Sequence, residues 1–341
     1  MAPRAFITGL SGLTLTPDER AFLREAAPWG LIVFKRNVSD PAQLTALVAA
    51  FREAVGWQAP VLVDQEGGRV QRLGPPHWPP YPPGAAYAAI YDRDPAAGLT
   101  AARLGARLIA SDLHALGIDV DCLPLADVPV PGSDNVIGDR AYGERPDKVA
   151  ALAGAVAAGL LNGGVLPVLK HMPGHGRATA DSHLRLPVVA TERAVLETSD
   201  FAAFRPLANL PLGMTAHVVF SAIDPVAPAT TSATMVREVI RRGIGFQGLL
   251  MSDDISMGAL SGTLAERSVA ALAAGCDLVL LCNGKLDEMR AVAGAVPQLS
   301  GEAGQRAQAA LAARKAPGEF DAEGARAIFA AMLAGEQVKT S

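Results

Sequence analysis

Eight short apolar runs recur along the chain, and each is followed by a stretch whose apolar positions have helical spacing. The runs are rich in Leu, Ile and Val and do not alternate with polar residues, as is typical of strands buried on both faces of a parallel sheet. The pattern therefore predicts eight strand-then-helix units, with strands at 5–7, 31–34, 60–63, within 117–125, and at 165–169, 212–216, 247–251 and 277–281.

Two of the predicted helices begin with strong local signals. Thr16-Pro17-Asp18-Glu19 supplies an N-cap residue, a proline at the first helical position and a glutamate at the third. Asp40-Pro41 begins a second helix in the same way. The remaining helices are predicted near 99–117, 147–161, 192–207, 232–242, 263–274 and from about 286 onward.

Eight such units within about 300 residues favour a closed (β/α)8 TIM barrel over a doubly wound open sheet. No G-x-G-x-x-G follows the first strand, which also argues against the open sheet. We expect one catalytic domain over residues 1–341, with a proline-rich insert near 74–97 and a helical C-terminal extension from about 300. Six prolines between Pro75 and Pro83 exclude a regular helix or central strand there.

Polar residues follow the predicted strands at regular places. Asp64 follows the third strand, Lys170 and His171 follow the fifth, His217 follows the sixth and Asp253 follows the seventh. Because active sites of these barrels lie at the carboxyl ends of the strands, we expect these side chains to share one rim.

The densest polar cluster is the stretch KHMPGHGRATADSH at 170–183, which contains half of the six histidines. One interpretation is a glycosidase, in which a carboxylate acts as nucleophile and a second group as acid and base. The alternative is a metal-dependent hydrolase with His171, His175 and Asp181 as ligands. A Pro-Gly turn separates the first two histidines, so they do not share a helix face, and HExxH is absent.

Composition narrows the function mainly by exclusion. The 341 residues carry a formal net charge of −4, which gives no general attraction for nucleic acid or anionic lipid. Cys122, Cys276 and Cys282 lie in or beside apolar runs without C-x-x-C, as expected of buried thiols in a reducing compartment.

The N-terminus has neither a long apolar segment nor a small-residue cleavage site, so we expect a cytoplasmic protein. The charge-free stretch 149–169 is interrupted by Asn162-Gly163-Gly164 and Pro167. We interpret it as a buried helix followed by a buried strand, not as a membrane span.

Four motifs together resemble glycoside hydrolase family 3, and within it the single-domain bacterial cytoplasmic β-N-acetylglucosaminidases. They are DQEGGRVQR at 64–72, KHMPGHG at 170–176, DSH at 181–183 and SDDISM at 252–257, in family order over about residues 5–300. The resemblance implies a TIM barrel that releases terminal N-acetylglucosamine from peptidoglycan fragments, GlcNAc-anhydro-muropeptides, in cell-wall recycling. It implies a small sugar substrate, no cofactor and no catalytic metal, and we favour a monomer.

The resemblance also assigns roles to individual residues. Asp253, the first of an Asp pair, matches the nucleophile, and His183 matches an acid/base group that replaces the usual second carboxylate. Asp181 matches the partner that holds this imidazole. Sugar-binding positions match Asp64, Arg72, Arg140, Lys170 and His171. The chain departs from the family pattern at Met172, where Phe is common, and at Ile255, where Leu is common.

These assignments imply a two-step reaction with a covalent glycosyl-enzyme and retained configuration. Attack by the acetamide of the substrate itself is the alternative to attack by Asp253. A family 3 β-glucosidase, the metal-dependent hydrolase and a non-catalytic sugar-binding barrel are the other functions considered. We expect the loop that carries His183 to close on substrate.

For three further residues near these motifs, we weigh a structural role. Asp254 suits a capping role beside Asp253. His175 is expected to be structural, bonding within its Pro-Gly-His-Gly turn. His217 fits a residue of the pocket and a buried rim histidine equally well.

Overall fold

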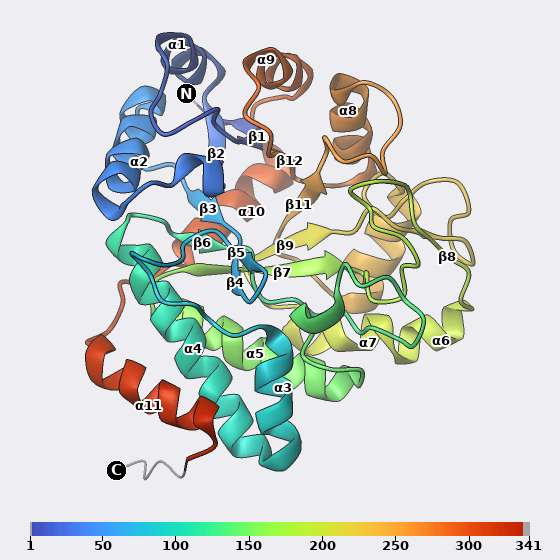
Figure 1. Ribbon diagram of the computed structural model, residues 1–341. Helices are drawn as coiled ribbons and strands as arrows, with labels where there is room; N and C mark the ends of the chain where they lie inside the picture. Colours follow the sequence, from blue (N-terminus) through green and yellow to red (C-terminus); the bar gives the residue numbers. More distant parts are fainter. Residues whose placement is uncertain (1, 337–341) are drawn as a thin grey trace.

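Eight parallel strands close into a barrel in the computed structural model, which describes residues 2–336 (Figure 1). Strand β1 hydrogen-bonds to β2 on one side and to β12 on the other, with Phe6 opposite Val279, and this pairing closes the sheet. The barrel strands are β1 (Arg4–Thr8), β2 (Pro28–Val33), β3 (Val61–Val63), β6 (Val120–Asp121), β7 (Leu166–Met172), β9 (Leu212–Thr215), β11 (Leu249–Asp254) and β12 (Leu278–Leu281).

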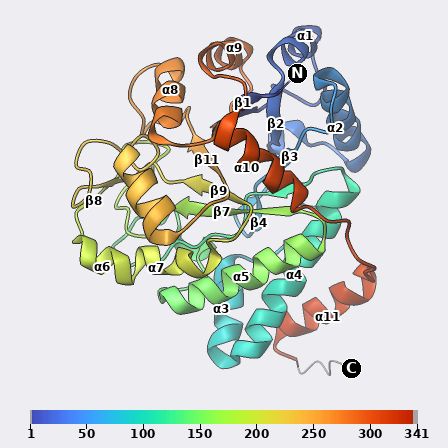
Figure 2. The ribbon, with the colours of Figure 1, turned by 180° about the vertical axis from the view of Figure 1, so that it is seen from behind.

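Helices form an outer ring around the barrel strands (Figure 2). The apolar side chains of the strands are buried in the hydrophobic core. Each barrel strand is followed by one or more helices, so the predicted (β/α)8 TIM barrel is confirmed. The helices that follow the strands in order are α1 (Pro17–Ala26), α2 (Pro41–Val55), α3 (Gly84–Arg93) with α4 (Pro95–Ala115), α5 (Pro146–Asn162), α6 (Arg193–Thr198) with α7 (Asp200–Phe204), the π-helix η4 (Met235–Ile244), α8 (Leu264–Ala274) and α9 (Leu286–Ala295).

The two helix-start predictions are confirmed at the level of single hydrogen bonds. The Glu19 backbone N–H donates to Thr16 Oγ1 at 3.1 Å, and the Thr16 N–H donates back to the Glu19 carboxylate at 2.8 Å. Asp40 caps α2 by accepting from the Gln43 N–H at 2.9 Å. Such caps satisfy backbone donors that have no partner inside the helix.

The segment predicted as a proline-rich excursion is only partly irregular. The prolines end at Pro83, and the alanine-rich sequence after it forms α3, while α4 begins at Pro95, earlier than expected. The predicted helix over 192–207 is broken at Ser199, whose backbone is not helical. There the side chains of Ser199 and Asp200 both accept from Arg177, so a tertiary contact overrides the local helical preference.

Two strands at the site extend beyond their predicted ends. Strand β7 continues through Lys170 and His171 to Met172, and β11 continues through Asp253 to Asp254. These polar residues therefore project from strand ends rather than from the loops after them. The reason is that neighbouring barrel strands supply ladder partners regardless of side-chain polarity.

Two helices follow the barrel, α10 (Gly301–Ala312) and α11 (Ala322–Ala334). Helix α11 packs against α4, and Arg326 bonds to Asp112 and to the Tyr81 hydroxyl. Within residues 2–336, none of the helices has the length and apolar content needed to cross a membrane.

Candidate active site

A cavity of about 360 Å³ opens at the carboxyl ends of the barrel strands. This is the face on which barrels of this type carry their chemistry. The structure brings all eight residues named from the sequence into its lining: Asp64, Arg72, Arg140, Lys170, His171, Asp181, His183 and Asp253.

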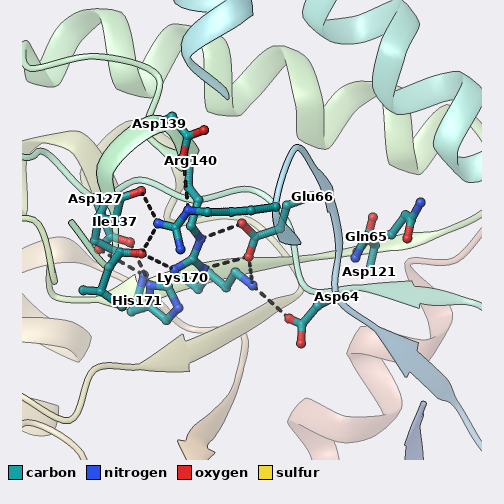
Figure 3. A network of polar contacts seen from close by, with 12 residues as sticks. Asp64, Gln65, Glu66, Asp121, Asp127, Ile137, Asp139, Arg140, Lys170 and His171 are labelled. Atoms are coloured by element: carbon teal, nitrogen blue, oxygen red, sulfur yellow. Dashed lines mark hydrogen bonds and ion pairs between the residues drawn. The ribbon is translucent and has the colours of Figure 1, made fainter. Parts of the chain in front are cut away.

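One wall of the cavity is a network of two carboxylates and three cations. Figure 3 shows Asp64, Glu66, Lys170 and Arg140 of this network. Lys170 Nζ lies 3.0 Å from Asp64 Oδ1 and 2.6 Å from Glu66 Oε1. Arg72 donates to the other oxygen of Asp64 at 2.9 Å, and Arg140 binds Glu66 through two hydrogen bonds of 2.8 Å. The two parallel hydrogen bonds fix the planes of the Arg140 guanidinium and the Glu66 carboxylate relative to each other. Such rigidity suits precise positioning of donors toward a ligand.

The charges of this network are mutually stabilised. Burial alone would raise the pKa values of Asp64 and Glu66. The Lys170 ammonium outweighs burial, together with Arg72 at Asp64 and with Arg140 at Glu66, and both carboxyl pKa values are lowered. Burial alone would lower the pKa of Lys170, yet the two carboxylates raise it. The wall therefore presents three cations against two carboxylates, which suits binding of sugar hydroxyl and carbonyl oxygens.

The proline-rich segment supports this wall from behind. Glu66 lies on a short hairpin of β4 (Gln65–Gly67) and β5 (Val70–Gln71). The Gln71 side chain donates to the Pro79 carbonyl at 3.1 Å and accepts from the Tyr81 N–H at 2.9 Å. The Tyr81 carbonyl accepts from the Gly68 N–H at 2.8 Å, where a positive φ of 56° favours glycine. The stiff segment thus fixes the hairpin that carries Glu66.

A buried aspartate orients the histidine on β7. Asp127 Oδ2 lies 2.7 Å from His171 Nδ1, and its Oδ1 accepts from the His171 backbone N–H at 3.3 Å. Burial works against the ionised form of Asp127, but the adjacent histidine outweighs it and lowers the carboxyl pKa. A carboxylate on Nδ1 leaves Nε2 as the ring atom available to a ligand.

The Asp pair at the end of β11 divides into two different environments. Asp253 is partly exposed to the cavity, and burial is outweighed by His217 and His171, which lower its pKa. Burial raises the pKa of Asp254, which accepts hydrogen bonds from Ser256 and from the Cys282 N–H. Asp254 therefore has the structural, turn-capping part, and Asp253 is the ionised carboxylate of the cavity.

His183 and Asp181 form a pair on the loop after β7. The His183 ring Nδ1 lies 2.7 Å from Asp181 Oδ1, which also accepts from the His183 backbone N–H at 2.9 Å. Burial alone would raise the pKa of Asp181, but the hydrogen bonds from His183 outweigh it, and the pKa is lowered. The imidazole is 65% exposed, so protons can exchange with solvent.

Two further histidines near the site, His175 and His217, have structural positions; the sequence predicted such a position for His175 and left that of His217 open. The prediction that the His175 side chain bonds within its own turn is wrong, because its Nε2 lies 2.9 Å from Ser182 Oγ, outside that turn. His217 is fully buried, with Nδ1 at 2.7 Å from Thr230 Oγ1 and Nε2 at 3.0 Å from the Asp254 carbonyl. It is thus a buried rim histidine that supports the β11 terminus.

Three residues of the site were not identified from the sequence. Glu66 lies in the motif DQEGGRVQR, and Ser182 lies between Asp181 and His183, but neither the strand-end rule nor the resemblance gives them a role. Asp127 lies beyond the end of β6, two residues after Leu125, whose bridge with Lys170 carries the pairing of the fourth strand past Pro124. With that bridge included, the strand-end rule extends to Asp127.

Within residues 2–336, no group of three or more His, Cys, Asp or Glu side chains is arranged to hold a metal ion. Two of the three ligands considered from the sequence have other partners, since His171 bonds to Asp127 and His175 to Ser182. The arrangement is instead an ionised carboxylate at the end of β11 and a carboxylate-held imidazole on the loop after β7, both lining one cavity. These are the two groups that retaining glycoside hydrolysis requires.

Comparisons with known proteins agree with this geometry. Residues 12–314 match the family model described as the glycosyl hydrolase family 3 N terminal domain. A β-hexosaminidase of Alkalilimnicola ehrlichii is 44% identical over 81% of this chain and 79% of the relative. The crystal structure of NagZ from Neisseria gonorrhoeae in complex with N-trifluoroacetyl-D-glucosamine has a TM-score of 0.85 and 32% identity, with 98% of this chain and 97% of that chain covered. A second structure of that NagZ, in complex with zinc ion, has a TM-score of 0.83 at the same identity and coverage.

Proposed function

Because the chain belongs to glycoside hydrolase family 3, we propose that it is a retaining, exo-acting β-N-acetylglucosaminidase. The observation that carries the proposal is the cavity shared by ionised Asp253 and the His183–Asp181 pair. The relatives support the sugar class, since one is named a β-hexosaminidase and another is in complex with an N-acylated glucosamine.

In the first step, Asp253 attacks the anomeric carbon of the bound sugar. Imidazolium His183 donates its Nε2 proton to the departing glycosidic oxygen, and the bond to the leaving group breaks. Asp181 Oδ1, which lies 2.7 Å from Nδ1, fixes the ring plane and leaves Nε2 available for proton transfer. The products of this step are a glycosyl ester on Asp253, the freed alcohol and neutral His183.

In the second step, neutral His183 takes a proton from water, and the oxygen of that water attacks the anomeric carbon. The ester bond to Asp253 breaks, and the sugar leaves with its original configuration. The lowered pKa of Asp253 suits both steps, because a stable carboxylate is a nucleophile in the first and a leaving group in the second.

We assign the charged wall to the sugar hydroxyls. Lys170 and Arg72 with Asp64, and Arg140 with Glu66, offer fixed donors and acceptors around the cavity. His171, held by Asp127, offers one further ring nitrogen. Paired charges of this kind bind hydroxyl groups in defined directions without moving during the reaction.

The biological substrate that we propose is a GlcNAc-containing peptidoglycan fragment, from which the enzyme, a monomer in the cytoplasm, releases the terminal N-acetylglucosamine during cell-wall recycling. The small volume of the cavity, about 360 Å³, suits one terminal sugar ring with the leaving group directed outward. This supports release of single terminal residues.

The test is a panel of nitrophenyl β-glycosides of N-acetylglucosamine, glucose and xylose. We expect the highest kcat/KM for the N-acetylglucosaminide, and Asp253→Asn should lower it by at least about 10³-fold because the nucleophile is lost. A preference for glucose would move the chain to the β-glucosidase branch of the family.

The same panel with and without chelator tests the metal-dependent alternative. We expect equal rates in both arms, since the mechanism uses only Asp253 and His183 on the reacting atoms. Loss of activity with chelator, restored by added zinc, would contradict the proposal.

A further inference from the structure

Ser182 lies between the two exposed residues of the acid/base pair but is itself buried. Its residue exposure is 2%, whereas the side chains of Asp181 and His183 are 33% and 65% exposed. The Ser182 hydroxyl oxygen lies 2.9 Å from His175 Nε2. The loop therefore directs one side chain into the protein at the point where it presents His183 outward.

His175 is a rigid partner for this hydroxyl. It is almost fully buried, and its backbone N–H donates to Asp127 Oδ1 at 2.7 Å. Burial and the nearby His171 lower the His175 pKa to about 4, so the ring is neutral at neutral pH. Its Nδ1 has no partner among the described residues. Because a buried unpaired donor is rarer than an unpaired acceptor, the ring proton sits on Nε2 and is donated to Ser182.

A second set of contacts holds the same residues from the other side of the cavity. The Gly258 N–H donates to the His183 carbonyl and the Ala259 N–H to the Ser182 carbonyl, each at 3.1 Å. Gly258 and Ala259 belong to the loop after β11, the strand that carries Asp253. Ser182 thus has two anchoring contacts: its side chain bonds to His175 near the end of β7, and its carbonyl bonds to Ala259 of the loop after β11.

We propose that Ser182, through its hydrogen bond with His175, is a positioning residue that holds the acid/base loop against the barrel once the loop has closed, with His183 at the cavity. The proposal rests on the catalytic role of His183 proposed above. Asp127 links this anchor to the sugar site, because the same carboxylate accepts from the backbone N–H groups of His171 and His175. The anchor sets the distance of His183 from the leaving group and contributes nothing to the reacting atoms.

The test compares Ser182→Ala with Thr179→Ala, which removes a hydroxyl and a methyl group at an exposed position of the same loop. Each enzyme hydrolyses a nitrophenyl and an alkyl β-N-acetylglucosaminide. For Ser182→Ala we expect kcat on the alkyl glycoside to fall about tenfold, since this poor leaving group needs the acid, and to change less than about threefold on the nitrophenyl glycoside. Thr179→Ala should match the wild type on both.

Amide hydrogen exchange supplies a readout independent of activity. We expect residues 181–185 to exchange faster in Ser182→Ala than in Thr179→Ala, with exchange of the barrel strands unchanged. His175→Asn, which removes the same hydrogen bond from the other side, should give the same signature, and the double variant should be no worse than either single one. This second route also serves if Ser182→Ala folds poorly.

Equal behaviour of Ser182→Ala and Thr179→Ala in rate and exchange would overturn the anchor, as would equal losses on both substrates. Failure of the proposed function is distinguishable, because the wild type would then hydrolyse neither N-acetylglucosaminide. In that case the exchange data alone decide whether Ser182 fixes the loop.

Discussion

At the scale of single residues, neighbours decide which carboxyl groups are ionised. Asp253 and Asp254 are adjacent in sequence, yet the pKa of the first is lowered and that of the second is raised. Both are desolvated, but histidines face Asp253, while the contacts that Asp254 accepts do not offset its burial. The division of roles therefore follows from environment, not from residue type.

His183→Ala tests the acid role at this scale. We expect kcat to fall by about 10²-fold or more on an alkyl glycoside, because the leaving oxygen then departs without a proton. On a nitrophenyl glycoside, whose leaving group is stable as an anion, the loss should be much smaller. Steady-state rates on the two substrates check this, and equal losses would argue against an acid role.

Asp121 provides a prediction about pH and stability. It is fully buried, and burial raises its pKa well above the usual range, since one oxygen has no partner among the described residues. A raised pKa contributes stability at low pH that is lost as pH rises through the folded value. Asp121→Asn should therefore raise the free energy of unfolding at pH 7 by about 1 kcal/mol or more, with the gain vanishing near pH 4.

Urea unfolding of the wild type and Asp121→Asn at the two pH values provides the measurement. Asp64 and Glu66, whose pKa values are lowered, act in the opposite direction and lose their contribution as pH falls. A destabilisation by Asp121→Asn of equal size at both pH values would show that the carboxyl group is ionised and paired in the fold.

The eight site residues could be named in advance, by the strand-end rule for some and by motif resemblance for others. The sequence could not show which partner each one has. Glu66 reaches Lys170 only because a hairpin and a proline-rich segment fold over the rim, and nothing local predicts that contact. Asp127 was missed although the strand-end rule applied to it as well.

At the scale of elements, the positions of strands were predictable and their ends were not. The apolar runs locate the strands, but β7 and β11 continue through charged residues because the ladder continues beside them. The prediction of an irregular insert over about 74–97 is wrong after Pro83, because the alanine-rich sequence that follows forms helix α3. Boundaries thus depend on tertiary partners that the local sequence does not contain.

Gly258 tests the contact between the β7 and β11 loops. A Cβ atom there would lie 2.9 Å from the carbonyl oxygens of both His183 and Leu184, so the acid/base loop would have to shift. We expect Gly258→Ala to lower kcat on an alkyl N-acetylglucosaminide by about tenfold or more. Gly294→Ala, where a Cβ meets nothing within 4 Å, is the matched control in steady-state assays. Identical rates for the two variants would refute the expected shift.

At the scale of the whole molecule, ion pairs at the amino ends of the strands fasten the C-terminal part to the barrel. Asp277 accepts from Arg241 at 2.8 Å and from Arg306 of α10 at 3.0 Å, and it is almost fully buried. Asp119 likewise binds Arg52 and Arg314. These contacts lie on the face opposite the cavity, so stability and catalysis are separated in space.

Asp277→Ala tests this separation. Removal of a buried partner leaves two arginines without their carboxylate, and we expect the free energy of unfolding to fall by about 3 kcal/mol. The kcat at 25 °C should stay within about twofold of the wild type, because no group in the cavity is changed. Asp287→Ala, which removes an exposed pair with Arg290, should cost less than about 0.5 kcal/mol. A loss of kcat in the folded Asp277 variant would contradict the separation.

The architecture was the most predictable property of the molecule. Eight apolar runs separated by helical stretches leave few alternatives to a closed parallel barrel. The proposed mechanism depends instead on one carboxylate, that of Asp253, so it is tested most directly by trapping that residue.

The decisive measurement is mass spectrometry of the enzyme after reaction with an activated fluorinated N-acetylglucosaminyl donor, which slows the second step. We predict a mass increase of one glycosyl unit on the peptide that contains Asp253, and none in Asp253→Asn. Turnover with retained configuration but no adduct, together with detection of a cyclised acetamide product, would show that the substrate and not Asp253 is the nucleophile.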